Sequence, residues 1–171
     1  MAFADELERN NEKYVATFGD KGSLPLPPAK KLAVLSCMDA RFDPFAALGL
    51  REGDAHHIRN AGGRFDPDAV RSLVISQTLL GTREVVVVHH TGCGMLTFKQ
   101  ADVRELLQRR EGLSVEGKAL ARELETHEFG DLEASVREDV EAVRRHALVL
   151  EGTPVSGWVY EVETGRARRV V

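Results

Sequence analysis

The sequence contains few cysteines: two, Cys37 and Cys93, among 171 residues. A disulfide between them is not expected in a reducing compartment, where two isolated cysteines are more often metal ligands, catalytic groups or core residues. Long apolar runs are also absent, and none reaches the roughly 18 residues that a membrane-spanning helix needs. The N-terminus is polar and acidic, unlike a signal peptide. We therefore expect a cytoplasmic protein that does not cross a membrane.

The sequence also lacks an excess of positive charge. It has 23 Lys and Arg against 27 Asp and Glu, a net charge of −4 and a pI of about 5.9. This balance gives no electrostatic reason to expect nucleic acid or an anionic membrane as a partner. What is present is a hydrophobic content of 43%. That content supports one compact domain, which we predict to span residues 1–171.

Predicted strands and helices alternate along the chain. Short apolar runs predict strands over 31–37, 54–63 and 83–93, and a final strand–turn–strand unit over 155–171. Amphipathic spacing predicts helices over 43–50, 66–82, 96–112 and 132–149, whereas 113–131 is ambiguous. This alternation predicts an α/β fold of three layers, with a mostly parallel central β-sheet flanked by helices.

Residues 1–30 precede this pattern and predict an N-terminal helical arm. A helix is expected over 4–19, with apolar residues that include Leu7, Tyr14 and Val15, and a proline-rich connector over 22–30. The arm has no clear place on a small α/β core. We therefore expect its apolar face to pack against a second subunit.

The segment LSCMDARFDP, residues 35–44, places three reactive side chains where the first strand ends. Cys37, Asp39 and Arg41 occupy every second position. Because side chains at such spacing point to the same face of an extended chain, we expect a thiol, a carboxylate and a guanidinium in one small space. Taken singly, Cys37 also fits a buried core residue, and Asp39 with Arg41 also fits a surface ion pair.

The segment VVHHTGCGM, residues 87–95, supplies a second group of polar residues at the end of the valine-rich strand. His90 and Cys93 have the spacing H-x-x-C, which allows both side chains to face one ion. With Cys37 they form a set of three ligands that favours zinc and leaves a fourth position open. Asp39 is the remaining candidate ligand. His89 points to the opposite face of the strand from His90 and fits a structural role.

Together these motifs resemble the β-class carbonic anhydrases, and most closely their short bacterial members. The resemblance rests on C-x-D-x-R at 37–41, RNAGG at 59–63 and H-x-x-C-G at 90–94. It covers about residues 31–99. It implies one zinc ion per chain, held by Cys37, His90 and Cys93, and the reversible hydration of CO2 to bicarbonate. It also implies a homodimer or homotetramer, with active sites near the subunit interface.

The resemblance also implies roles for the neighbouring residues. Asp39, paired with Arg41, is expected to stay ionised and to orient the attacking water. If the pair breaks, Asp39 can become a fourth metal ligand and close the site. Gly94 is expected either to allow the backbone to approach the substrate or to serve as a simple turn glycine.

Three alternatives remain open from the sequence. Hydrolases of carbonyl sulfide or carbon disulfide share this metal set, so the substrate is not fixed. A non-enzymatic zinc-binding regulatory module would bind the metal without hydration activity. A cysteine-nucleophile enzyme using Cys37 with Arg41 is disfavoured, because its anion-binding loop would need more glycine between the two.

Overall fold

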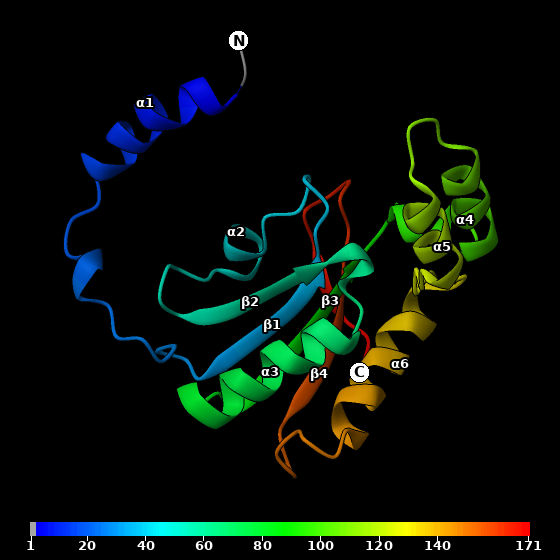
Figure 1. Ribbon diagram of the computed structural model, residues 1–171. Coiled ribbons are helices and arrows are strands. Elements are labelled where there is room, and N and C mark those ends of the chain that lie inside the picture. Colours follow the sequence, from blue (N-terminus) through cyan, green and yellow to red (C-terminus); the bar gives the residue numbers. More distant parts are fainter. Residues whose placement is uncertain (1–2) are drawn as a thin grey trace.

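The computed structural model describes residues 3–171, and residues 1 and 2 of the expected domain lie outside the described residues. Five strands form one sheet in the order β2-β1-β3-β4-β5 (Figure 1). Neighbouring strands pair in parallel except β5, which runs antiparallel to β4. The strands are β1 (Leu32–Cys37), β2 (Ala55–Asn60), β3 (Glu84–His90), β4 (Val155–Tyr160) and β5 (Ala167–Arg169). The predicted α/β fold with a mostly parallel sheet is confirmed.

Six α-helices accompany the sheet within residues 3–171. They are α1 (Ala4–Val15), α2 (Pro44–Leu48), α3 (Pro67–Leu80), α4 (Gln100–Arg109), α5 (Val115–Glu123) and α6 (Leu132–Arg145). The predicted helix over 96–112 begins later, because residues 94–96 form a turn of 3₁₀ helix. The ambiguous stretch 113–131 contains α5. None of the helices in the described part of the chain is both long and apolar enough to cross a membrane.

Valine side chains on β3 alternate between the two faces of the sheet. Val85 and Val87 are buried against α3 and α6, whereas Val88 packs with Phe42 and α2 on the opposite face. α6 contributes Val136, Val140 and Val143 to the first layer, a spacing that aligns them on one face of a helix. The sheet is thus covered by helices on both sides, which gives the three layers that the sequence predicts.

Acidic N-caps fix where the covering helices begin. The Asp66 carboxylate accepts the Ala69 N–H at 2.8 Å and Pro67 follows in the first turn of α3. Asp131 caps α6 in the same way, at 2.7 Å from the Ala134 N–H. Each cap satisfies a backbone donor that has no partner within its helix. These caps anchor α3 and α6 on the face of the sheet that they cover.

The order of the strands decides where a site can form. β1 lies between β2 and β3, so the chain after β1 first forms β2 on one side of it and later forms β3 on the other side. The carboxyl ends of parallel strands meet at one edge, and a crevice opens where the strand order switches direction. β1 ends at Cys37 and β3 ends at His90. The two sequence motifs therefore meet at this edge.

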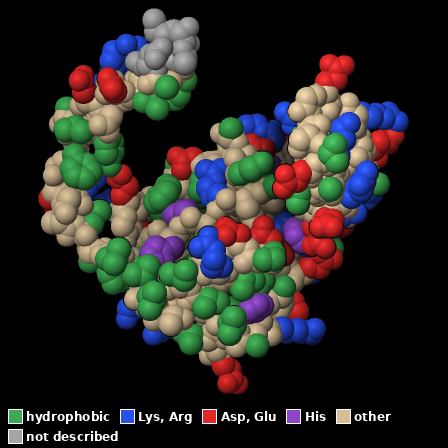
Figure 2. All heavy atoms as spheres, viewed as in Figure 1, with side chains coloured by type: hydrophobic (Ala, Val, Ile, Leu, Met, Phe, Trp, Pro, Cys, Tyr) green, Lys and Arg blue, Asp and Glu red, His purple; other side chains and the backbone are tan. Residues whose placement is uncertain are grey.

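The N-terminal arm, residues 3–30, extends away from the sheet (Figure 1). Tyr14 donates a hydrogen bond to Glu52, and Lys21 forms an ion pair with the same carboxylate. Leu7 and Val15 on α1 remain more than half exposed, and hydrophobic side chains are visible along the arm in Figure 2. Within one chain, α1 is thus held to the rest of the protein mainly through contacts at its C-terminal end.

Candidate metal centre

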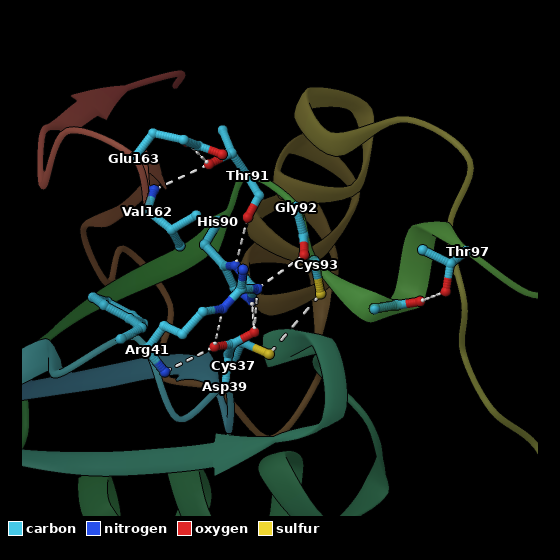
Figure 3. A network of polar contacts seen from close by, with 12 residues as sticks. Cys37, Asp39, Arg41, His90, Thr91, Gly92, Cys93, Thr97, Val162 and Glu163 are labelled. Atoms are coloured by element: carbon cyan, nitrogen blue, oxygen red, sulfur yellow. Dashed lines mark hydrogen bonds and ion pairs between the residues drawn. The ribbon is translucent and has the colours of Figure 1, made fainter.

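Cys37, His90 and Cys93 converge at the carboxyl edge of the sheet (Figure 3). Their ligand atoms all lie within 4.8 Å of one another, and the two sulfurs are 4.0 Å apart. All three residues are buried. β1 positions Cys37, β3 positions His90, and the turn after β3 returns Cys93 to the same point. The structure thus brings together the three ligands that the sequence predicts.

The donor set fits a tetrahedral zinc ion. Zn–S bonds of about 2.3 Å place two ligating sulfurs about 3.8 Å apart, close to the separation seen here. His90 Nδ1 lies 2.9 Å from the Thr91 carbonyl and donates to it, which leaves Nε2 as the free nitrogen. That Nε2 is buried and has no hydrogen-bond partner within residues 3–171. Because buried polar atoms are nearly always paired, the unpaired nitrogen is consistent with a metal ligand.

The two thiols differ in how readily they ionise. The neighbouring Cys93 thiol, His90 and the backbone amides of Asp39 and Gly62 lower the pKa of Cys37 against the opposing effect of burial. The hydrogen bond to Cys37 and burial raise the pKa of Cys93. Ionisation of one thiol thus opposes ionisation of the other. A divalent cation removes this conflict, because its charge stabilises both thiolates.

Asp39 is held beside the cluster by Arg41. Asp39 Oδ1 accepts the backbone N–H and the Nε–H of Arg41, both at 2.9 Å, and Oδ2 accepts the Nη2–H at 2.7 Å. These bonds hold the pKa of the Asp39 carboxyl well below its usual range. Asp39 Oδ2 lies 3.6 Å from His90 Nε2. The carboxylate therefore borders the ligand atoms, while its oxygens are engaged by Arg41.

The sequence predicts Cys37, Asp39 and Arg41 on one face of an extended chain, and this prediction is wrong for Asp39 and Arg41. β1 ends at Cys37, so Asp39 and Arg41 lie in a loop and do not continue the alternation of a strand. The Arg41 backbone N–H bonded to the Asp39 side chain closes a local turn instead. Arg41 Nη2 also donates to the Gly92 carbonyl at 3.0 Å (Figure 3). Arg41 thus links the loop after β1 to the turn after β3.

The sequence prediction assigned no role to Arg59, which fixes the loop that carries Asp39. Arg59 Nε donates to the Cys37 carbonyl at 3.0 Å, and Nη2 donates to the carbonyls of Asp39 and Phe42 at 2.9 and 3.0 Å. A planar guanidinium suits this task because it can donate to several acceptors at once. The available signal was a charged residue at the end of a predicted strand, within the RNAGG motif.

A cavity of about 240 Å³ opens beside the two sulfurs. Its lining is largely apolar and consists of Cys37, Met38, Asp39, Ala61, Gly62, Cys93, Gly94, Met95 and Phe98. A Cβ added to Gly94 would meet no other described atom within 4 Å. The absence of a side chain there therefore leaves open space at the cavity, and a role for Gly94 in substrate binding stays a prediction.

Comparison with known proteins identifies the family and agrees with the observed fold. A family model described as "Carbonic anhydrase" matches residues 32–167, which include both motifs. This chain belongs to the carbonic anhydrase family. Its β class follows from the relatives below, so the predicted membership of the β-class carbonic anhydrases and the predicted enzyme type are confirmed.

Three relatives illustrate how far the likeness extends. A solved structure of carbonic anhydrase from Glaciozyma antarctica is 55% identical, covers 100% of both chains and superposes with a TM-score of 0.95. "Beta-carbonic anhydrase 1" of Mycobacterium tuberculosis is 39% identical over 99% of each chain. A "Carbon disulfide hydrolase" of Acidithiobacillus thiooxidans is 32% identical over 98% of this chain and 90% of its own. The family thus includes both activities that the sequence left open, with the hydrolase the more distant of these three.

Proposed function

We propose that this carbonic anhydrase family member catalyses the reversible hydration of CO2 to bicarbonate and a proton. One zinc ion per chain would be held by Cys37, His90 and Cys93. The observation that carries this proposal is the buried, unpaired His90 Nε2 facing two sulfurs that are 4.0 Å apart. When bound, the zinc ion would make water a nucleophile near neutral pH and would stabilise the negative charge that develops in the reaction.

Asp39 supplies the hydrogen-bond acceptor for the attacking water in this proposal. Its ionised form is favoured by Arg41, so it can accept a hydrogen bond from the attacking water and orient the oxygen lone pair towards the substrate. While Arg41 engages both carboxylate oxygens, Asp39 is held back from the metal position. Release from Arg41 would allow Asp39 to become a fourth ligand and to block the open position.

The cavity next to the sulfurs fits the chemistry of the substrate. CO2 is small and uncharged, so an apolar space can admit it without desolvating a charged group. Met38, Met95 and Phe98 form this apolar lining, and Gly94 leaves space at its edge. Asp39 and the two cysteines line the same cavity. This arrangement would direct the carbon atom of CO2 towards the water that Asp39 orients.

Carbon disulfide is the second candidate substrate, because relatives with that activity are 32% identical to the chain. The higher identity to proteins named carbonic anhydrase favours CO2. Stopped-flow CO2 hydration, measured beside carbon disulfide and carbonyl sulfide hydrolysis on zinc-quantified protein, separates the two. We expect CO2 hydration to dominate. Hydrolysis of a sulfur analogue with little CO2 hydration would reject the proposed substrate.

The same proposal includes a homodimer or homotetramer in which α1 contacts a second copy. Phe3, Leu7 and Val15 are 68%, 52% and 60% exposed, which is unfavourable for apolar side chains on a helix with few contacts of its own. A second copy would cover this surface. Light scattering of a variant that lacks residues 1–22 should show weaker self-association. An unchanged oligomer, or a monomeric wild type, would reject this part of the proposal.

A further inference from the structure

A buried polar cluster lies on the opposite face of β3 from His90. His89 is fully buried, and its Nε2–H donates to the Gly63 carbonyl at 3.2 Å. The same nitrogen lies 3.1 Å from Asp139 Oδ2, and Asp139 is only 4% exposed. Because both neighbours of Nε2 are acceptors, this nitrogen carries the proton. On the other side of the ring, Nδ1 lies 2.8 Å from Ser135 Oγ on α6.

The Asp139 carboxylate is bound to the segment that follows Gly63. Oδ1 accepts the Phe65 backbone N–H at 3.1 Å, and Oδ2 lies 3.4 Å from Arg64 Nε. Asn60, on the other side of the turn, donates its Nδ2–H to the Arg64 carbonyl at 2.7 Å. The cluster therefore holds the C-terminal end of the Ala61–Gly63 turn, and the Asn60–Arg64 bond closes the turn across its base.

This turn lies directly against the first metal ligand. Gly63 has a φ of +71°, and a Cβ at this position would lie 2.9 Å from the Cys37 backbone nitrogen. The Gly62 backbone amide lies near enough to the Cys37 sulfur to lower the pKa of that thiol. A cysteine side chain can rotate about χ1, so a fixed donor beside the sulfur selects one orientation. The position of the turn thus decides where the Cys37 sulfur points.

Phe129 provides a second connection between the buried cluster and the ligands. Its ring stacks on His89, with centroids 5.4 Å apart and planes inclined by 18°. Phe129 also packs in one buried group with Cys37, Cys93 and Met95. Movement of His89 would therefore be transmitted to the sulfurs through Phe129 as well as through the turn.

Core packing alone does not explain a histidine and an aspartate at these positions. Val85 and Val87 precede His89 on the same face of β3 and fill that face with apolar side chains. Burying a carboxylate beside an imidazole costs desolvation free energy, which a valine or leucine would avoid. The polar pair instead provides directed contacts to Gly63 and Phe65 that an apolar residue cannot make.

We propose that His89 and Asp139 are positioning residues for the metal centre, which hold the Ala61–Gly63 turn so that the Cys37 sulfur faces His90 and Cys93. The inference rests on the proposed zinc site. Neither residue touches the substrate or the ligand atoms. Their effect is on the affinity and the geometry of the metal site, in the way that outer hydrogen-bond partners of metal ligands act.

The test measures zinc affinity by competition with a chelator in the full-length Asp139→Asn and His89→Leu variants. Cobalt(II) replaces zinc in a second measurement, because the sulfur-to-cobalt charge-transfer absorption reports the metal–cysteine bonds directly. We expect zinc affinity to fall by about 10- to 100-fold and the charge-transfer absorption to change. His89→Gln, whose amide can still donate towards Gly63, should recover part of the affinity.

Ser76→Ala is the matched control. It removes a part-buried hydrogen bond to another histidine, His56, at 2.7 Å and a bond to Thr82, and Ser76 makes no hydrogen bond to the Ala61–Gly63 turn within the described residues. It should lower stability and leave zinc affinity unchanged. If His89→Leu does not fold, Asp139→Asn keeps the size of the side chain and carries the test. Wild-type zinc affinity in folded Asp139→Asn would overturn this inference alone, whereas a wild type that binds no zinc would overturn the proposed function and this inference together.

Discussion

His89 and His90 are consecutive and both fully buried, yet they occupy two different chemical environments. Both ring nitrogens of His89 have protein partners, Ser135 on one side and Gly63 on the other. His90 has one such partner, the Thr91 carbonyl, and its Nε2 has none within the described residues. Burial therefore does not distinguish a structural histidine from a metal ligand. What distinguishes the metal ligand is an unpaired nitrogen within 4.8 Å of two cysteine sulfurs.

The difference arises from the alternation of a strand. Successive side chains of β3 enter opposite layers, so His89 faces α6 while His90 faces the loop after β1. α6 supplies a hydroxyl and a carboxylate to His89. Near His90, the end of β1 supplies the Cys37 thiol, the turn after β3 supplies the Cys93 thiol, and the loop after β1 supplies the Asp39–Arg41 pair. The environment of His89 provides partners for both ring nitrogens, whereas that of His90 leaves Nε2 available to bind a metal.

The same substitution at both positions tests this comparison, with the largest effect expected at His90. His90→Leu should reduce zinc affinity by more than about 100-fold, since even outer partners of ligands contribute 10- to 100-fold. CO2 hydration should be lost with the metal. The unfolding free energy of the metal-free protein should fall by only about 1 kcal/mol, because the hydrogen bond from Nδ1 to the part-buried Thr91 carbonyl is lost and Nε2 has no partner to lose. Elemental analysis and urea denaturation measure the two effects, and a fully zinc-loaded variant would contradict the ligand assignment.

Arg41→Ala should have the next largest effect. Zinc should remain bound, while CO2 hydration falls by about 100-fold, a typical contribution of a positioned acid–base group. The reason is that Asp39 loses the three donors that hold it ionised and away from the metal. X-ray absorption of the zinc should show an added oxygen ligand.

Arg109→Ala is a matched control for that variant, because it removes an exposed ion pair with Glu105 on α4. It should leave zinc content and hydration rate unchanged. Full activity of Arg41→Ala, or an unaltered zinc coordination sphere in it, would reject the proposed role of the Asp39–Arg41 pair.

His89→Leu should show the reverse pattern of His90→Leu in the metal-free protein. The Gly63 carbonyl and Asp139 would lose their buried partner, which costs about 2 kcal/mol of unfolding free energy. Zinc binding should weaken yet persist, unlike in His90→Leu. Urea denaturation of both metal-free variants decides the point. Equal destabilisation by the two substitutions would mean that the two histidines are not distinguished by their partners.

Gly94→Ala should have the smallest effect. Its Cβ would meet no described atom within 4 Å and its φ is not in the left-handed region, so stability should change by no more than about 0.5 kcal/mol. A methyl group at the cavity should raise KM for CO2 while kcat stays near the wild-type value. An unchanged KM would leave Gly94 as a turn residue and remove it from the substrate site.

Local patterns were sufficient to predict the sheet and the three ligands. The valine run gave β3, and the spacing of His90 and Cys93 depends only on the turn that follows it. The helix α5 was not predictable in the same way, because it has only nine residues, Gly117 lies within it and no apolar stripe marks it. At the start of α3, Asp66 and Pro67 mark the helix in the sequence in addition to its apolar spacing.

Contacts between distant segments could not be predicted from the sequence. Arg59 reaches three carbonyls of another loop, and Asp139 reaches His89 across the layer between α6 and the sheet. Neither contact leaves a periodic signal in the sequence, and the RNAGG motif marks Arg59 without showing its partners. The loop position of Asp39 and Arg41 was also missed, because alternate spacing looks the same in a strand and in a turn closed by a side chain.

Zinc content and CO2 hydration rate, measured on the same samples of wild type, His90→Leu and His89→Leu, test the central claim most directly. The account predicts about one zinc per wild-type chain, none in His90→Leu, and zinc in His89→Leu only when the free metal concentration is raised. Hydration rate should follow zinc content across all three. Undiminished hydration by zinc-free wild type, or full zinc loading and activity of His90→Leu, would contradict the metal centre described here.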